Sequence, residues 1–192
     1  MKNISYAFSS IFSDNEWFNK VLVGGLCFFL IPFFIGFILI FGFQVEFAKR
    51  ILRGEQGMPM WREIQKIVKS GTKTGTAAFF YLGILLLVLF AIGINTISWK
   101  TFFVLSIAHF FWNPLLLAHF AKTESFISCF NPAKILKSSL LKLSNYLFAV
   151  AASGVLISVA FLLGWMWIVV GWTLLIFLAM LVQTHLFVDM NL

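Results

Sequence analysis

Three polar side chains that could do chemistry fall within one long apolar stretch of the sequence, residues 101–121. His109 and Asn113 stand four residues apart, so a helix would place them on one face. His119 follows ten residues after His109 and would be turned about 80° away from it. A metal site or a proton relay would need several such groups to converge. We interpret the three as a candidate polar cluster that hydrogen-bonds between helices.

The sequence contains no recognisable catalytic signature. It has no Gly-x-Ser-x-Gly or His-Glu-x-x-His pattern and no phosphate-binding or dinucleotide-binding glycine loop. Cys27 and Cys129 are too isolated to suggest a metal site or a disulfide framework. We therefore predict no catalytic residue, no cofactor and no metal ligand, and we expect that the protein is not an enzyme.

A second group of candidate residues, all basic except Trp61, lies between the apolar stretches, in residues 46–73 and 122–142. Basic side chains near a membrane surface favour contacts with anionic lipid headgroups, or with a protein partner. The candidates for such contacts are Arg50, Arg53, Trp61, Arg62, Lys66, Lys69, Lys134 and Lys137.

The composition indicates an integral membrane protein. Of 192 residues, 61% are hydrophobic and 11% are charged, whereas roughly a quarter are charged in a typical soluble domain. A soluble protein of this length could not bury so much apolar surface. A disordered chain and a disulfide-stapled secreted domain are excluded as well. The net charge of +7 comes without any nucleic-acid-binding motif, so we expect no nucleic-acid partner.

Four stretches without charged residues could supply the membrane passes: residues 21–45, 74–99, 101–121 and 143–188. About 20 apolar residues cross a bilayer once as a helix. The second and third stretches each match one pass, and they would form a hairpin that turns at Trp99–Lys100. The last stretch is long enough for two passes, with a turn near Gly164.

The first stretch, residues 21–45, leaves two alternatives open. Its length suits a single pass that is kinked at Pro32. Pro32 and Gly36 could instead close the turn of a short or re-entrant hairpin. The protein would then have five or six transmembrane or re-entrant helices.

The distribution of basic residues predicts the orientation in the cell membrane. With a hairpin in residues 21–45, thirteen Lys and Arg residues lie on the cytoplasmic side and one lies outside. With a single pass, the numbers are eleven and three. Both basic loops and the C-terminus are cytoplasmic in either case, and the N-terminus is cytoplasmic in the hairpin arrangement.

Amphipathic helices are expected at the cytoplasmic face. An amphipathic segment occupies residues 1–20, and an amphipathic helix is predicted from Pro59 to Ser70, which Gly71 directly beyond it would end. Asn131-Pro132 opens another helix, in which Leu136 belongs to the apolar face. The predicted fold is one all-α polytopic membrane domain, residues 1–192, built from helical hairpins and these interfacial helices.

Short motifs spread along the chain resemble a known family. They are Ala7-Phe8, Asp14 to Trp17, Gly24-Gly25, Ile31-Pro32 with Gly36, Arg50, Arg53-Gly54-Glu55, Pro59 with Trp61, Phe130, Asn145-Tyr146-Leu147 and Thr184-His185-Leu186. With these motifs the chain resembles the family called domain of unknown function 4013, multi-pass membrane proteins of bacteria and archaea. The resemblance implies a membrane protein and supplies no activity and no catalytic residue.

Two classes of function fit these observations. The first is a non-enzymatic scaffold, assembly or partner-docking component, with membrane lipids and a protein partner or a second copy of the chain as partners. The alternative is a small transporter or channel for an apolar or lipid-like solute. The lack of charged residues in the apolar stretches argues against ion-coupled transport, and the many Phe residues argue against an aqueous pore.

Overall fold

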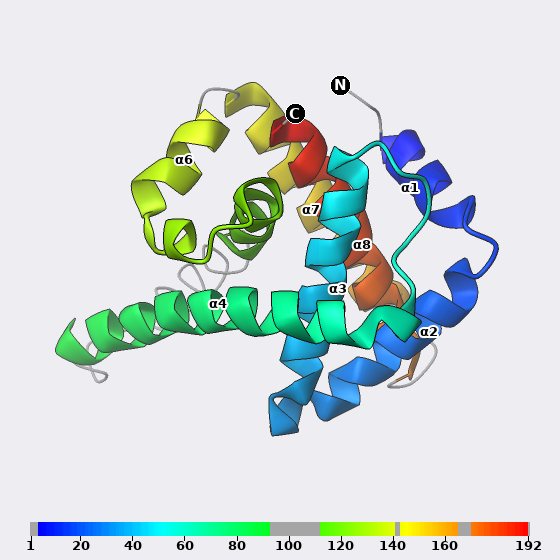
Figure 1. Cartoon of the computed structure of the whole chain (residues 1–192), viewed down its shortest axis with the longest axis horizontal. Coiled ribbons are helices and arrows are strands. Elements are labelled where there is room, and N and C mark those ends of the chain that lie inside the picture. Colours follow the sequence, from blue (N-terminus) through cyan, green and yellow to red (C-terminus); the bar gives the residue numbers. More distant parts are fainter. Residues whose placement is uncertain (1–3, 93–111, 141–142, 165–169, 192) are drawn as a thin grey trace.

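The computed structural model describes residues 4–92, 112–140, 143–164 and 170–191, which form helices joined by short loops (Figure 1). The expectation of an all-helical chain is confirmed for these residues, which contain no β-strand. The helices are α1 (Ile4–Phe12), α2 (Trp17–Leu26), η1 (Cys27–Phe33), α3 (Ile35–Leu52), η2 (Trp61–Glu63), α4 (Ile64–Ile92), a helix over residues 112–123, η4 (Ile127–Phe130), α6 (Pro132–Leu140), α7 (Leu143–Gly164) and α8 (Val170–Asn191).

Three helices in the described ranges are long and apolar enough to cross a membrane: Trp61–Ala91, Ser144–Gly164 and Gly171–Asp189. A fourth span results if the bent pair Ile4–Phe12 and Trp17–Phe33 is counted as one. These ranges do not confirm the five or six transmembrane or re-entrant helices that the sequence predicts, and about half of the predicted pass at residues 101–121 lies outside them. The predicted turn at Trp99–Lys100 lies outside the described residues.

The first apolar stretch contains a sharp turn. η1 ends at Phe33, and Phe34 adopts a left-handed backbone conformation with φ of 61°, while its N–H donates to the Ile31 carbonyl. Gly36 then packs against the Cys27 carbonyl, where a side chain would overlap it. Figure 1 shows α3 leading away from this turn beside η1. The geometry favours the hairpin over a single kinked pass; that both arms enter a bilayer stays a prediction.

α3 and α4 cross at two glycines. A Cβ atom at Gly42 would overlap the Ile67 carbonyl oxygen, and one at Gly71 would overlap the Ile38 carbonyl oxygen. Figure 1 shows α4 lying across α3. The prediction that a helix ends at Gly71 is wrong, because α4 continues through this residue to Ile92. Gly71 permits close packing rather than ending the helix.

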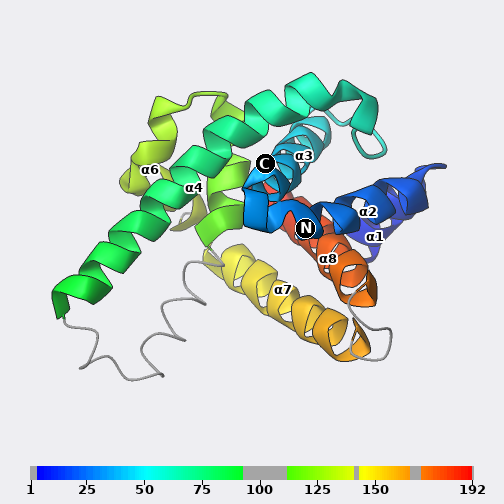
Figure 2. The ribbon, with the colours of Figure 1, turned by 90° about the horizontal axis from the view of Figure 1, so that it is seen from below.

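α7 and α8 pack against each other, and Figure 2 shows them side by side. α7 ends at Gly164, the residue near which the sequence predicts a turn. The ring of Trp172 occupies the space that a side chain at residue 164 would need. Its indole N–H donates to the Phe161 carbonyl at 3.0 Å, and the two rings stack.

α6 begins as the sequence predicts. The Lys134 backbone N–H donates to the Asn131 side chain at 3.1 Å, and Pro132 is the first helical residue. Among the α6 side chains that the structure describes, Ile135 is buried and Leu136 of the predicted apolar face is 39% exposed; that this face contacts lipid stays a prediction.

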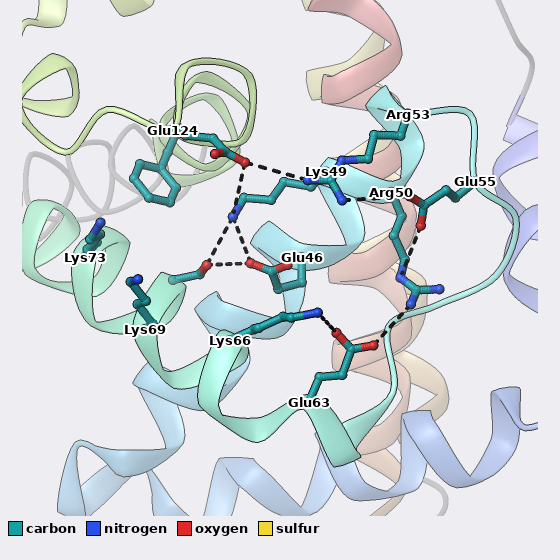
Figure 3. A pocket seen from close by; sticks show the side chains of 12 residues that line it. Glu46, Lys49, Arg50, Arg53, Glu55, Glu63, Lys66, Lys69, Lys73 and Glu124 are labelled. Carbon is teal, nitrogen blue, oxygen red and sulfur yellow. Dashed lines mark hydrogen bonds and ion pairs between the residues drawn. The ribbon is translucent and has the colours of Figure 1, made fainter.

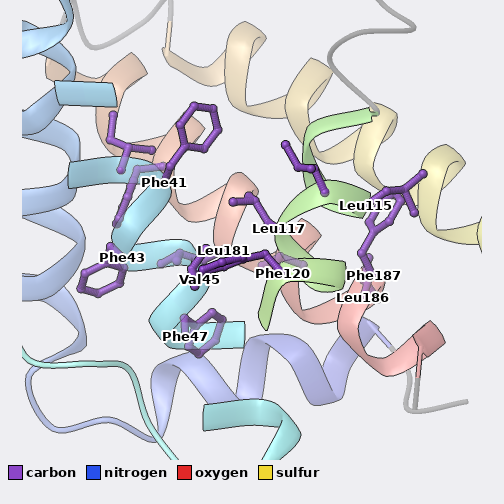
Figure 4. Close-up of a cluster of buried hydrophobic side chains, with 14 of the residues drawn as sticks. Phe41, Phe43, Val45, Phe47, Leu115, Leu117, Phe120, Leu181, Leu186 and Phe187 are labelled. Carbon is purple, nitrogen blue, oxygen red and sulfur yellow. The ribbon is translucent and has the colours of Figure 1, made fainter. Parts of the chain in front are cut away.

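The core is rich in phenylalanine and lies between α3, α8 and residues 112–123 (Figure 4). Phe43, Phe47, Phe177 and Phe187 are its largest fully buried side chains. Other large apolar side chains are exposed, at the turn after η1, in the second half of α4 and along α7. Exposed apolar surface on this scale is stable among lipid acyl chains but not in water.

Candidate functional site: a basic cleft between α3 and α4

A cleft of about 500 Å³ opens where α3, α4 and residues 112–123 meet (Figure 3). We call it the basic cleft. Its lining residues are Glu46, Lys49, Arg50, Arg53, Glu55, Glu63, Lys66, Lys69, Ser70, Lys73, Phe120 and Glu124. Six of them are Lys or Arg and four are Glu, so the cleft carries a formal charge of about +2 when all of them are ionised.

One wall of the basic cleft is a row of lysines on α4. Lys66, Lys69 and Lys73 are spaced three and four residues apart, which places them on one face of the helix. Lys66 forms an ion pair with Glu63 at 2.7 Å. Lys69 and Lys73 have no ion-pair partner among the described residues. Two cations of this wall are therefore available to an anion.

The opposite wall comes from the end of α3 and the loop that follows it. Arg50 lies 3.4 Å from Glu63 and 3.8 Å from Glu55, and Arg53 lies 3.8 Å from Glu55 and 3.9 Å from Glu124. Ion pairs that are long and partly exposed contribute about 0–1 kcal/mol each. A ligand phosphate could replace such carboxylates at little cost and accept paired hydrogen bonds from each guanidinium.

A partly buried hydrogen-bond network forms the floor of the cleft. The Ser70 hydroxyl donates to Glu46 Oε1 at 2.5 Å, and Lys49 Nζ donates to the same oxygen at 2.9 Å. A serine next to a lysine could suggest a hydrolytic site. Here Lys49 Nζ donates to the Glu46 carboxylate, the Ser70 hydroxyl donates to the same oxygen, and Ser70 is only 6% exposed. The network instead holds α3 against α4.

Glu124 reaches the cleft through an unusual backbone conformation. It follows the helix of residues 112–123 with φ of 51°, and its N–H donates to the Phe120 carbonyl. A left-handed conformation costs a non-glycine residue about 1–3 kcal/mol. It places the carboxylate 3.7 Å from Lys49. Glu124 is thus the anionic side chain that lines the cleft directly after the helix of residues 112–123.

Half of the predicted headgroup or partner contacts line the basic cleft: Arg50, Arg53, Lys66 and Lys69. Arg62, Lys134 and Lys137 are exposed outside it. Trp61 is half-buried; its ring stacks on Phe43 and its indole N–H donates to the Lys20 carbonyl.

Sequence reasoning missed several residues of the cleft. The spacing from Lys66 to Lys73 could have revealed the row on α4. Lys49 and Glu124 are brought to the cleft only by tertiary packing, which no local pattern encodes.

That His109, Asn113 and His119 form a polar cluster stays a prediction. His109 lies outside the described residues. Asn113 lines a small cavity between α3 and α8, and His119 is not among the residues of that cavity. Asn113 Oδ1 and His119 Nε2 are both buried without a hydrogen-bond partner among the described residues.

A second polar site joins the N-terminal helices to the loop before η2. Lys20 Nζ donates to Asp14 Oδ2 at 2.7 Å and to the Met58 carbonyl at 3.1 Å, and the Met58 N–H donates back to Asp14. Burial alone would raise the pKa of Asp14. Hydrogen bonds from Lys20 and from the Glu16 and Met58 N–H groups outweigh that effect and hold the pKa below its ordinary value.

Residues of the family resemblance lie at both sites. Arg50, Arg53 and Glu55 line the basic cleft, while Asp14 belongs to the polar site beside Lys20. No curated protein and no solved structure matches the chain. The model of a family described as "Protein of unknown function (DUF4013)" matches residues 25–170, which is most of the chain. The chain therefore belongs to the DUF4013 family.

Proposed function

We propose that the protein is a non-enzymatic, multi-pass membrane component that docks on anionic phospholipid through the basic cleft. The observation that carries this proposal is the lysine row on α4, in which Lys69 and Lys73 have no ion-pair partner among the described residues. On the opposite wall, Arg50 lies 3.8 Å from the Glu55 carboxylate and Arg53 lies 3.9 Å from that of Glu124. A phosphate group between the two walls would accept hydrogen bonds from both.

The course of α4 favours a lipid over a soluble anion. Lys73, Phe80 and Leu87 are spaced seven residues apart, so they lie along one side of the helix. Phe80 is 47% exposed and Leu87 is 69% exposed. A phospholipid with its headgroup at Lys73 could lay an acyl chain along these apolar side chains.

The proposed orientation places the basic cleft at the cytoplasmic surface. This assignment rests on the excess of Lys and Arg in residues 46–73 and 122–142. Residues 21–45 enter the bilayer as a re-entrant hairpin, so the N-terminus is also cytoplasmic. The exposed Phe33 and Phe34 at the turn support contact with acyl chains. A docking protein of this kind would act as a scaffold at the inner membrane surface.

Native mass spectrometry of the full chain in detergent tests the proposal, with phosphatidylglycerol added as the anionic lipid and phosphatidylcholine as the neutral one. The double variant Lys69→Gln/Lys73→Gln is compared with Lys134→Gln/Lys137→Gln, which removes the same charge from α6. At about 1 kcal/mol per lysine, the cleft variant should bind phosphatidylglycerol about 30-fold more weakly.

The α6 variant should keep the affinity of the wild type for phosphatidylglycerol. Equal losses in the two variants would point to an effect of net charge alone and would contradict a lipid site in the cleft. If the wild type bound phosphatidylcholine as tightly as phosphatidylglycerol, that result would also contradict a site for anionic lipid in the cleft.

A transporter for an apolar or lipid-like solute is the second candidate. The observation that favours it is the mostly apolar cavity of about 160 Å³ beside Asn113. Uptake of a fluorescent apolar solute into liposomes containing the purified protein would test it. Uptake no faster than into protein-free liposomes would exclude this function for that solute.

A further inference from the structure

A small cavity among η1, α3, α8 and residues 112–123 is separate from the basic cleft. Its volume is about 160 Å³, and phenylalanine and isoleucine side chains from η1 and α3 form much of its wall. Pro114, Leu117 and Met180 complete the apolar part. An apolar cavity of about 150 Å³ can hold one benzene ring, which sets the size of a ligand.

Buried amides interrupt this apolar wall. Gln44 and Gln183 line the cavity, and each is only 2% exposed. Gln44 Oε1 and Gln183 Nε2 have no hydrogen-bond partner among the described residues, and the same holds for Asn113 Oδ1 at the same cavity. Buried polar atoms are rarely left unpaired, so each such atom points to a missing partner.

The lining determines the chemistry of that partner. No charged side chain is among the described residues that line the cavity, so a charged ligand would lose its hydration without compensation. A purely apolar ligand would fill the space but leave the amides unpaired. Two of the unpaired atoms, Gln44 Oε1 and Asn113 Oδ1, are hydrogen-bond acceptors, and the third, Gln183 Nε2, is a donor. A hydroxyl group can donate and accept at once.

We propose that this cavity binds a small uncharged ring compound that carries a hydroxyl group. The ring packs against the Phe and Ile side chains, and the hydroxyl hydrogen-bonds to the amides of Gln44 and Gln183. Neither Lys69 nor Lys73 lines this cavity, so ligand binding here can be tested independently of lipid binding at the basic cleft.

Binding of 4-fluorophenol and of fluorobenzene can be compared by fluorine NMR on the full chain in detergent, with empty micelles as the reference for partitioning. The wild type should bind 4-fluorophenol at least tenfold more tightly than fluorobenzene. Gln44→Leu and Gln183→Leu should each remove this preference. Gln65→Leu, an exposed position on α4, is the matched control and should keep it.

Equal affinity of the wild type for the two probes would overturn the proposal, as would an unchanged preference in both cavity variants. Replacing an unpaired buried amide by leucine should not impair folding, which the thermal unfolding midpoint without probe verifies. A further variant, Met180→Phe, narrows the cavity and should weaken binding of both probes at least tenfold. Undiminished binding to this variant would place the probes elsewhere and refute the proposal.

Discussion

The ion pair between Asp14 and Lys20 shows how much of this fold depends on single residues. The two side chains are 9% and 7% exposed, and they connect the start of α2 to the Met58 backbone. Breaking a buried pair by removing one partner leaves a buried charge without compensation. Replacing both residues by uncharged ones removes the ion pair and leaves no buried charge without a partner.

Asp14→Asn keeps the shape of the side chain but leaves Lys20 charged and buried. We expect the free energy of unfolding to fall by about 3 kcal/mol. The double variant Asp14→Asn/Lys20→Met should recover most of this loss. Equilibrium unfolding in mixed micelles measures both, and equal destabilisation of the single and double variants would contradict the account.

The same pair predicts a pH dependence. The folded-state pKa of Asp14 lies below its ordinary value of 3.8, so its contribution to stability is fully present above pH 3.8 and is lost as the pH falls through the folded pKa. The stability difference between the wild type and the double variant should therefore be constant near neutral pH and shrink below pH 3.8. Equilibrium unfolding of both proteins across this pH range measures the difference. If the difference in free energy of unfolding grew on acidification, the predicted direction of the pH dependence would be wrong.

At the scale of elements, the crossing of α3 and α4 sets the position of the basic cleft. Gly42 and Gly71 let each helix approach the backbone of the other. Glu46 and Ser70 lie close to these glycines in the sequence, and they hydrogen-bond across the same interface. A wider crossing would therefore separate the two walls of the cleft.

Gly42→Ala and Gly71→Ala should each lower the free energy of unfolding by about 1–3 kcal/mol, since the added methyl group overlaps a carbonyl oxygen. Gly83→Ala is the control on α4, because its added methyl group meets no atom within 4 Å from the described residues outside the adjacent backbone of its own helix. It should be neutral or stabilising by up to about 1 kcal/mol. Similar effects at residues 71 and 83 would contradict a close crossing.

The sequence predicts helices better than it predicts their ends and their packing. Apolar periodicity and the Asn131-Pro132 motif predict that helices form, and α6 starts where the motif indicates. The predicted helix end at Gly71 is wrong, since a glycine that ends a helix and one that packs against a neighbouring helix are identical in the sequence.

For the candidate sites too, the sequence predicts local features better than it predicts contacts between distant residues. The lysine row on α4 is readable from spacing alone, whereas the meeting of Gln44 and Gln183 depends on how α3 packs against α8. Residues from distant parts of the chain are brought together by tertiary structure, for which one sequence offers no local signal.

In the proposed orientation of the whole molecule, the N-terminus and both basic loops lie on the cytoplasmic side. Single cysteines in place of Ser5, Gln65 and Lys134 would test this, since all three positions are exposed. The background should be low, because Cys27 and Cys129 are buried and burial raises the pKa of Cys129 to about 11.

A membrane-impermeant maleimide should label all three cysteines in inside-out vesicles and none of them in intact cells. Labelling at residue 5 from outside the cell would show that residues 21–45 cross the membrane once. Labelling at residue 65 or 134 from outside would contradict the orientation as a whole.

Lipid binding in the basic cleft is tested most directly by photo-crosslinking in bilayers that contain a photoactivatable anionic phospholipid. With the photoreactive group near the headgroup, we expect crosslinked peptides from the end of α3 and the first half of α4, including Lys69 and Lys73. Excess unlabelled phosphatidylglycerol should suppress them, and excess phosphatidylcholine should not. Crosslinks spread evenly over α6 and α7, or equal suppression by the two lipids, would contradict a specific site.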